Sequence, residues 1–179
     1  RNREERPEFT EPLEPVIAQV PEEDLSVCEN HITLEFLAEV TEQMGLSLDI
    51  TAKEGVESLY LDIQGKYSGT SIGKRGQTLD SLQYLVSLVV NKESEDYIKV
   101  KLDTENYRER RKETLENLAK NIAYKVKKTR KSVALEPMNP YERRIIHSAL
   151  QNDKFVETHS EGEEPYRKIV VTLKKGVKD

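Results

Sequence analysis

Two glycines, Gly73 and Gly76, stand directly before an apolar helical pattern, and this short segment restricts the possible folds more than any other. Glycine adopts backbone conformations that other residues avoid, and the first turn of a helix offers unpaired N–H groups. Lys74 and Arg75 add two positive charges between the glycines. Such a turn suits a phosphate backbone. The first candidate site is therefore Ile72-Gly73-Lys74-Arg75-Gly76.

The spacing of the glycines excludes two common nucleotide-binding loops. A Walker loop has four residues between its glycines and ends in Lys followed by Ser or Thr. Here only three residues separate Gly69 from Gly73, and Arg75 follows Lys74. The dinucleotide fingerprint needs Gly-x-Gly, which the sequence lacks. A turn that binds a nucleic-acid backbone remains.

Helical and alternating apolar patterns surround the glycine turn in a definite order. They predict helix, strand, strand, glycine loop, helix and strand over residues 32–44, 46–50, 59–63, 65–76, 77–90 and 98–102. Lys53-Glu54-Gly55 predicts the hairpin turn between the first two strands. The second helix carries the apolar residues Leu79, Leu82, Leu85, Val86 and Val89. The result is a compact α+β unit that ends near Asp103.

This order of elements around a Gly-x-x-Gly turn resembles that of a type II KH domain (αββααβ). In KH domains the turn holds about four nucleotides of a single strand. The resemblance implies a KH domain over residues 31–103, with Ile72 and Leu79 beside the bound strand. The alternative is an ordinary helix-capping turn whose Lys74 and Arg75 are merely solvated.

A second unit follows the first without a polar linker. Asp103 or Thr104 is suited to cap a long helix that runs to about Lys131. The apolar positions expected to face the core of this helix are Leu115, Leu118, Ile122 and Val126.

A second helix of this unit has a strong start at Asn139-Pro140, a cap residue followed by proline at the first helical position. Apolar segments at 155–156 and 169–171 flank a turn at 159–165, which predicts a hairpin. The second helix is expected to bury Ile146, Ala149 and Leu150.

Arg143 and His147 lie four residues apart in this second helix, so their side chains share a face. Arg144 lies on the same polar side as His147, and Arg143 lies at its border. A basic, half-exposed face suits contact with phosphate. Two alternatives stay open: Arg143 and His147 pair within the helix, or His147 packs against the sheet.

The Arg-x-x-x-His spacing defines R3H domains, and residues 135–147 and 160–167 closely resemble the core of that family. A KH domain followed directly by an R3H domain resembles the Jag family of bacterial RNA-binding proteins, also called KhpB or EloR. The run Gly73–Asp80 is typical of this family. The resemblance covers roughly residues 32–175 and implies an R3H domain over 104–179.

The Jag resemblance implies a function. Members bind RNA, associate through the KH domain with themselves or with a small single-KH partner, and influence cell elongation, division or sporulation. The glycine turn corresponds to the nucleotide clamp, and Arg143 and His147 to the R3H signature. Arg144 and Arg167 are added from their charge and placement. The candidate nucleic-acid-binding residues are thus Ile72, Gly73, Lys74, Arg75, Gly76, Arg143, Arg144, His147 and Arg167.

Charge is unevenly distributed in a chain whose net charge is −5. Residues 104–179 carry 18 basic and 12 acidic side chains, whereas residues 1–31 and 32–103 are acidic. A local positive field attracts polyanions even on an acidic protein. Residues 1–30, with four prolines and an excess of acids, are interpreted as a linker or tail. Family members carry a further domain before such a linker, and the chain starts with Arg1, so it is interpreted as part of a longer protein.

Composition excludes several other classes. A single cysteine, Cys28, excludes multi-thiolate metal sites, and the three histidines are far apart in the sequence. No stretch approaches the roughly 18 apolar residues of a membrane span, and no signal segment is visible. We therefore expect a cytoplasmic protein without a metal or cofactor.

Three functions are compatible with these residues. The leading one is non-enzymatic binding of single-stranded RNA, with single-stranded DNA also possible, in which Tyr141 or Tyr166 supplies stacking. The second is an interaction scaffold, a homodimer or heterodimer formed through the KH domain. The third is an enzyme that uses His147 as general acid and Arg143 as anion holder, although no positioned nucleophile or carboxylate accompanies them.

Overall fold

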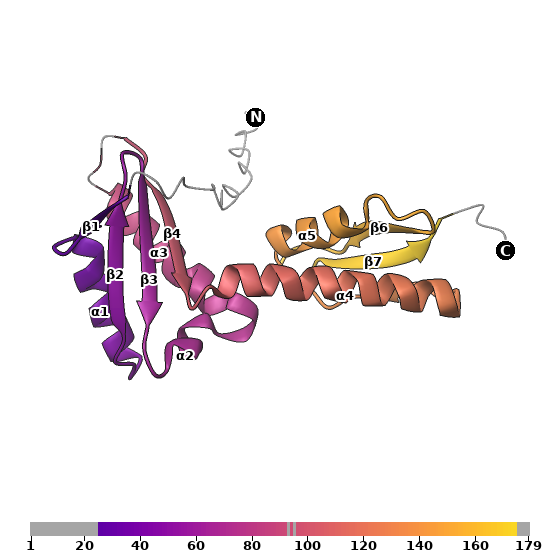
Figure 1. Cartoon of the computed structure of the whole chain (residues 1–179), viewed down its shortest axis with the longest axis horizontal. Coiled ribbons are helices and arrows are strands. Elements are labelled where there is room, and N and C mark those ends of the chain that lie inside the picture. Colours follow the sequence, from indigo (N-terminus) through magenta and orange to yellow (C-terminus); the bar gives the residue numbers. More distant parts are fainter. Residues whose placement is uncertain (1–24, 93, 95, 175–179) are drawn as a thin grey trace, which may run out of the picture. The chain divides into compact units, whose positions relative to one another are not determined.

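The computed structural model describes residues 25–92, 94 and 96–174. The chain divides into two compact units, one ending at Glu105 and one beginning at Asn106 (Figure 1). Each unit has its own sheet and mixes helices with strands, which gives the chain an α+β fold. Residues 1–24, most of the segment interpreted as a linker, lie outside the described residues, as do residues 175–179.

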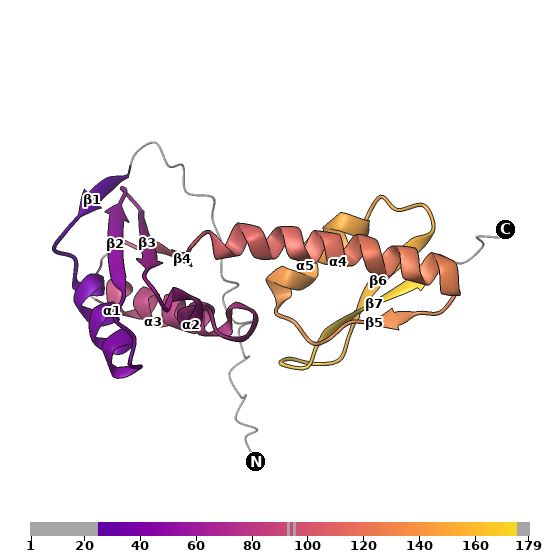
Figure 2. The same ribbon diagram turned by 60° about the horizontal axis from the view of Figure 1, so that its bottom comes forward.

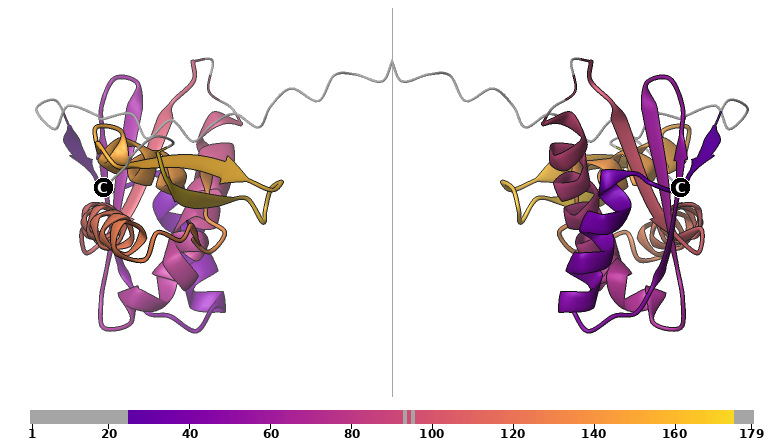
Figure 3. Two further views of the ribbon diagram at one scale, coloured as in Figure 1. Left: turned by 90° about the vertical axis from the view of Figure 1, so that its right-hand side faces the viewer. Right: turned by 90° about the vertical axis from the view of Figure 1, so that its left-hand side faces the viewer.

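The N-terminal unit is a four-stranded sheet covered on one face by two helices, α1 and α3 (Figure 3). The strand order is β1-β2-β3-β4, in which β3 and β4 are parallel and the other pairs antiparallel. From α1 onward the elements follow the expected αββααβ order. They are β1 (Ser26–Cys28), α1 (Ile32–Gln43), β2 (Asp49–Glu54), β3 (Ser58–Gln64), α2 (Ser68–Ile72), the 3-10 turn η2 (Lys74–Gly76), α3 (Gln77–Asn91) and β4 (Lys99–Thr104).

Alternation in β3 builds the core of this unit. Leu59, Leu61 and Ile63 are fully buried on the face that α1 and α3 cover, as the two-residue period of a strand requires. In α3, the buried side chains are Leu79, Leu82, Val86 and Val90. Leu85, another apolar residue of this helix, is exposed, because α3 packs against the sheet through the neighbouring stripe of its surface.

Three details of this unit differ from the sequence expectations. Strand β1 forms within the segment assigned to the linker, where Val27 pairs with Lys53 of β2. Strand β2 continues to Glu54, so the hairpin turns at residues 55–57, closed by a hydrogen bond from Gly55 N to Ser58 O (2.8 Å). The expected loop over 65–76 contains the short helix α2.

The C-terminal unit packs two helices on a three-stranded antiparallel sheet of order β5-β7-β6 (Figure 2). Asn139 caps the second helix as expected, since its side chain accepts a hydrogen bond from Glu142 N (2.8 Å). The elements are α4 (Tyr107–Thr129), β5 (Val133–Ala134), α5 (Pro140–Leu150), β6 (Val156–Glu161) and β7 (Lys168–Leu173). The buried core comprises Leu115, Ala119, Ala123, Val126, Ile146, Leu150, Val156, Ile169 and Val171.

The long helix α4 departs from expectation in its start and in its buried stripe. Asp103 and Thr104 do not cap it, because both belong to β4, where Thr104 Oγ1 donates to Ile63 O (2.6 Å). The helix begins after Asn106, which has a φ of 58°. Leu118 is exposed and Ala119 is buried in its place.

Candidate nucleic-acid interface

The glycine turn lies between α2 and α3 and consists largely of left-handed backbone. The φ angle is 69° at Gly73, 57° at Arg75 and 83° at Gly76. Gly76 occupies the N-cap position of α3 and makes no side-chain cap hydrogen bond, while the N–H of Gln77, the first residue of the helix, donates to Lys74 O. Lys74 is exposed and Arg75 half-buried. The turn therefore offers backbone donors and a cation on one short segment.

Gly73 is required by its surroundings. A Cβ atom at this position would lie 2.0 Å from Thr78 Oγ1 and 2.8 Å from Thr78 Cβ. Such distances are far inside van der Waals contact, so the first turn of α3 would have to move. The close approach of the turn to Thr78 fixes where the backbone donors of α3 stand.

The residues beside the turn are only partly accessible. Ile72 is half-buried at the end of α2, whereas Leu79 is fully buried and so forms no wall of a surface groove. Ser71 donates from Oγ to Ser68 O (2.6 Å), and Ser68 Oγ donates in turn to a carboxylate oxygen of Glu105. This second contact anchors α2 to the end of β4. No local pattern in the sequence indicates it, because its partners lie 37 residues apart.

In the C-terminal unit, Arg143 is buried and forms two hydrogen bonds. The residue is 7% exposed. Nη1 donates to Met138 O (2.7 Å), and Nη2 donates to Glu164 Oε1 (2.7 Å) in the segment between β6 and β7. Arg143 therefore ties the start of α5 to the β6–β7 loop. Glu164 carried no sequence signal as its partner, since it lies 21 residues away.

His147 contacts β6 through both ring nitrogens. Its Nδ1 lies 2.6 Å from Thr158 Oγ1 and its Nε2 3.1 Å from Ser160 Oγ. Burial lowers the pKa of His147, and the electrostatic influence of Arg143 and then of His159 lowers it further. The ring is therefore neutral at pH 7. His147 thus packs against the sheet, which is one of the two alternatives that the sequence left open. Its partners, Thr158 and Ser160, alternate along β6, and this alternation is a local pattern by which they could be found.

The lowered pKa of His147 predicts how stability depends on pH. The neutral ring is favoured in the folded state, so its stabilising contribution is present above the unfolded-state pKa of about 6.5 and is lost as the pH falls through the folded-state pKa. We expect the free energy of unfolding, measured with urea at a series of pH values, to fall less steeply below pH ~6.5 in His147→Gln than in the wild type. Lys154→Gln, an exposed substitution in the same domain, is the control. Equal slopes in the wild type and His147→Gln would contradict the prediction.

Arg144 and Arg167 are exposed, unlike Arg143. Arg144 lies on α5. Arg167 directly precedes β7, and its main-chain carbonyl accepts a hydrogen bond from Met138 N (3.2 Å). Tyr166, one of the two tyrosines considered for stacking, is exposed next to Arg167. The structure thus brings Arg143 and His147 to the side of α5 that faces β6 and its loop, while the glycine turn belongs to the other unit.

A basic run lies at the end of α4 and just after it, and not all of it is available to a ligand. It comprises Lys125, Lys127, Lys128, Arg130 and Lys131. Lys127 donates to Asp153 Oδ2 (2.6 Å) and lies 5.2 Å from the centre of the Phe155 ring. Burial opposes ionisation of Asp153, but hydrogen bonds from Lys127 and from two backbone N–H groups outweigh it and lower the pKa of this carboxyl. Lys125 and Lys128 are exposed.

The part of the chain that the structure describes contains neither a metal-binding cluster nor a helix suited to span a membrane. Within it, no cluster of three or more His, Cys, Asp or Glu side chains is placed to hold a metal ion. None of its helices is both long and apolar enough to cross a bilayer. Cys28 is a free thiol on β1.

Each of the two units matches a known protein-family model. The family model described as the KH domain of KhpA/KhpB matches residues 33–102, and that of the R3H domain matches residues 113–173. The RNA-binding protein KhpB of Clostridium symbiosum is 65% identical over 144 residues, which are 79% of this chain and 65% of that protein.

Two further similar proteins are also KhpB proteins. The RNA-binding protein KhpB of Bacillus subtilis (strain 168) is 39% identical over 142 residues, 78% of this chain and 68% of that protein. That of Lactiplantibacillus plantarum is 37% identical over 141 residues, 79% of this chain and 44% of that protein. The chain thus spans less than two thirds of the Clostridium and Lactiplantibacillus proteins. Because the chain has a KhpA/KhpB-type KH domain followed by an R3H domain and is similar to these KhpB proteins, it belongs to the KhpB family, which is the Jag family that its sequence resembles.

Proposed function

We propose that this chain binds single-stranded RNA without catalysing a reaction, through the glycine turn of the KH domain and through exposed basic residues of the R3H domain. The observation that carries the proposal is the glycine turn at the start of α3, where Gly73 packs against Thr78, Gly76 occupies the N-cap position without a capping side chain, and Lys74 is exposed. The relatives reported above bear the name RNA-binding protein, which supports RNA as the ligand.

At the glycine turn, the RNA backbone would lie against the N–H groups of the first turn of α3. The helix dipole and the charges of Lys74 and Arg75 favour a phosphate there. A KH turn spans about four nucleotides. Ile72, half-buried at the end of α2, would contact the sugar or base next to that phosphate.

In the R3H domain, we assign direct contact to Arg144 and Arg167, whose side chains are exposed. Tyr166, exposed beside Arg167, would stack on a base. Arg143 and His147 would act by holding α5 against β6 and the β6–β7 loop, since their side chains already contact protein groups. The excess of basic residues over 104–179 supports this division of roles.

The test is a fluorescence-anisotropy titration of a short single-stranded RNA at ~50 mM and ~200 mM salt. Released counterions make binding weaker at the higher salt concentration. We expect Lys74→Asp/Arg75→Asp to lower affinity by about tenfold or more at the lower salt, because the phosphate loses both cations. Aspartate tolerates the left-handed backbone of residue 75 better than most residues do.

Matched controls separate a local effect from a change in net charge. Lys53→Asp/Lys92→Asp reverses two exposed charges of the same domain away from the turn and is expected to bind nearly as well as the wild type. Arg144→Ala/Arg167→Ala should lose affinity relative to Lys125→Ala/Lys128→Ala. Equal affinities of both test variants and their controls would refute the proposal. DNA of the same sequence tests whether the 2′-hydroxyls matter.

A second function is supported by the outer face of α3. Tyr84, Leu85 and Leu88 lie at helical spacing and are 64%, 42% and 50% exposed. Adjacent apolar side chains of this size on a surface helix are typical of a protein interface. We propose that the KH domain forms a homodimer, or a heterodimer with a small single-KH protein, through this face.

Sedimentation of the wild type and of Leu85→Glu/Leu88→Glu tests the α3 interface. We expect the wild type to dimerise as concentration rises and the variant to stay monomeric, because paired carboxylates would be desolvated in the interface. The exposed pair Thr51→Glu/Lys53→Glu on β2 is the control. A variant that dimerises like the wild type would place the interface elsewhere.

The resemblance to the Jag family further supports a cellular role. We propose that the protein acts in the cytoplasm as a post-transcriptional regulator of cell elongation, division or sporulation. Cells carrying Lys74→Asp/Arg75→Asp would show the same change in cell shape as cells that lack the gene, whereas Lys53→Asp/Lys92→Asp would not.

A further inference from the structure

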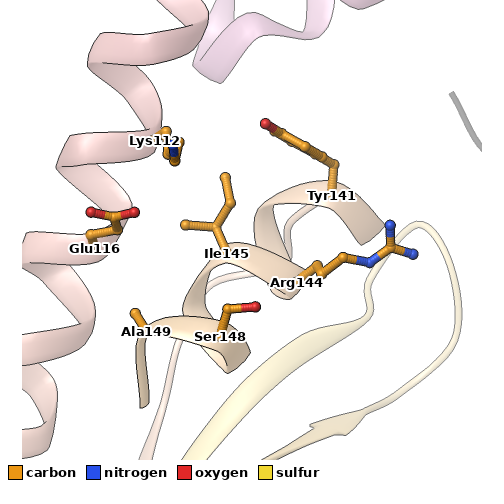
Figure 4. Close-up of a pocket in the computed structure, with 7 residues that line it drawn as sticks. All are labelled: Lys112, Glu116, Tyr141, Arg144, Ile145, Ser148 and Ala149. Atoms are coloured by element: carbon orange, nitrogen blue, oxygen red, sulfur yellow. The ribbon is translucent and has the colours of Figure 1, made fainter. Parts of the chain in front are cut away.

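A groove runs between α4 and α5 of the R3H domain, apart from the Arg143 and His147 side chains. Helix α4 contributes Lys112 and Glu116, and α5 contributes Tyr141, Ile145 and Ala149 (Figure 4). The cavity has a volume of about 350 Å³, within the range of small-molecule sites.

The groove lies on the side of α5 opposite to Arg143 and His147. Tyr141, Ile145 and Ser148 recur at spacings of four and three residues and so share one face. Arg143 and His147 share another, which faces β6 and its loop. The R3H signature and the groove are therefore two separate surfaces of one helix.

Strong contacts beside the groove fix its two walls. Arg111 Nε donates to Glu142 Oε1 (2.7 Å), and Glu142 is almost completely buried, so this ion pair joins α4 to α5. Beneath the groove, Leu115 and Ile146 are fully buried in the common core. The groove is thus preformed, which reduces the entropic cost of occupying it.

The side chains of the groove combine an apolar floor with polar groups around it. Ile145 lies at the centre, between the α4 side chains and the ring of Tyr141 (Figure 4). Lys112 supplies a cation at one wall, although it also lies 3.6 Å from Glu109 Oε1. Glu116 supplies a hydrogen-bond acceptor on the same helix. An aromatic ring, small apolar surface and flanking cations are the groups that bind nucleobases and their phosphates.

Arg144 lies between the two surfaces of α5. Its stem lines the groove, while its guanidinium points away from Ile145 and Glu116 (Figure 4). A phosphate bound by this guanidinium would belong to a nucleotide whose base enters the groove. The same guanidinium would also contact RNA that is bound by Arg167.

We propose that the α4–α5 groove binds one base of the RNA, stacked on Tyr141, with its exocyclic amino group toward Glu116 and its phosphate on Arg144. This inference rests on the proposed RNA-binding function. Because a carboxylate accepts from the exocyclic amino group of cytosine, adenine or guanine, a group that uracil lacks, the groove would prefer bases that carry it. Charge favours a nucleotide over a neutral protein segment here, since the groove is lined by two cations, Lys112 and Arg144, and by one acid, Glu116.

The first test compares tyrosine variants in the whole chain. Tyr141→Leu, which keeps apolar volume but removes the ring, is expected to lower the affinity for a cytidine-containing single strand by about fivefold or more, and Tyr141→Phe to retain it. Tyr124→Leu removes an exposed tyrosine of α4 outside the groove and is the matched control. Equal affinities of Tyr141→Leu and Tyr124→Leu would overturn the assignment.

Photocrosslinking gives a readout that does not depend on affinity. RNA with a central 5-iodocytidine should crosslink to the peptide that contains Tyr141, and Tyr141→Leu should abolish that product. Crosslinks confined to the glycine turn or to Tyr166 would overturn the groove while leaving RNA binding intact. If Tyr141→Leu instead alters self-association at unchanged RNA affinity, the groove binds protein and the proposal is wrong.

A last arm separates failure of the groove from failure of RNA binding. If the wild type binds no RNA at low salt, cytidine 5′-monophosphate is titrated while the amide resonances of α5 are followed by NMR. Shifts at residues 141–149 that are absent in Tyr141→Leu would support a nucleotide site independent of RNA. No shifts would overturn the site together with the function.

Discussion

Replacing Gly73 with alanine is expected to lower the free energy of unfolding of the KH domain by roughly 2–5 kcal/mol. Gly73 has φ 69° and ψ −165°, a combination that is essentially restricted to glycine. In addition, the new Cβ would lie 2.0 Å from Thr78 Oγ1. Strain and steric overlap therefore act together at this one position.

Two further variants identify the cause. Gly69→Ala, four residues earlier in α2, introduces a Cβ with no atom within 4 Å and should be neutral or stabilising by up to about 1 kcal/mol, as alanine favours helix. Thr78→Ala removes the nearest overlapping atom, so the double variant Gly73→Ala/Thr78→Ala should recover part of the loss. A second overlap at Thr78 Cβ, 2.8 Å away, and the unfavourable φ prevent full recovery.

Urea unfolding followed by far-UV circular dichroism, with amide NMR of the turn, measures these effects. The double-mutant cycle should give a coupling of at least about 0.5 kcal/mol between positions 73 and 78. Strictly additive losses would show that the steric overlap with Thr78 is not the cause. A Gly73→Ala variant as stable as Gly69→Ala would contradict the conformational argument as well.

The geometry of Gly73 also decides how RNA binding has to be tested. A side chain at Gly73 would displace α3, so a Gly73 variant would lose RNA binding even if the turn itself did not contact RNA. Lys74 and Arg75 can be changed without placing a Cβ against Thr78. Reversing the charges of Lys74 and Arg75 is therefore the informative test of RNA binding, whereas the glycine variants report on the packing of the turn against α3.

The αββααβ order and the two units could be predicted from the sequence because their patterns are local. Leu59, Leu61 and Ile63 alternate, and one stripe of apolar residues defines α3. Asn139 and Pro140 likewise determine a helix start through interactions within one turn. Where neighbouring residues supply the partners, the sequence pattern was sufficient.

Predictions failed where distant partners override local preference. Asp103 and Thr104 are good cap residues, yet pairing with Asp62 and Ile63 of β3 makes them the end of a strand. Strand β1 is only three residues long and depends on β2 for its hydrogen bonds, so no periodicity indicates it.

The same reason limits what the sequence says about the candidate site. Arg143 and Arg144 are adjacent and chemically identical, but only the fold shows that the first is buried against Met138 and Glu164 while the second is exposed. A helical wheel placed Arg143 at the border of the apolar face. It could not show the loop that covers Arg143.

Replacing Arg143 with alanine is the second large effect, expected to lower the free energy of unfolding of the R3H domain by about 2–3 kcal/mol. The change removes the hydrogen bonds to Met138 O and Glu164 Oε1 and leaves space where the buried side chain packed. Glu164 is 51% exposed and can be hydrated, so the ion pair accounts for the smaller part. The main cost is the partly buried carbonyl of Met138.

Conservative variants separate these contributions. Arg143→Lys keeps the charge but has no planar fork, so it can serve only one of the two acceptors and should recover about half of the loss. Glu164→Gln keeps an acceptor oxygen and should cost less than about 1 kcal/mol. Arg144→Ala, next in the chain but exposed, should leave the free energy of unfolding unchanged within about 0.5 kcal/mol.

RNA titration distinguishes a supporting role of Arg143 from direct contact. At a temperature where the wild type and Arg143→Ala are both fully folded, Arg144→Ala is expected to lose more RNA affinity than Arg143→Ala, although Arg143→Ala is the less stable of the two. The reverse order, with Arg143→Ala as stable as the wild type in urea and unable to bind RNA, would show that Arg143 contacts RNA directly. In that case the contacts to Met138 and Glu164 would have to open when RNA binds.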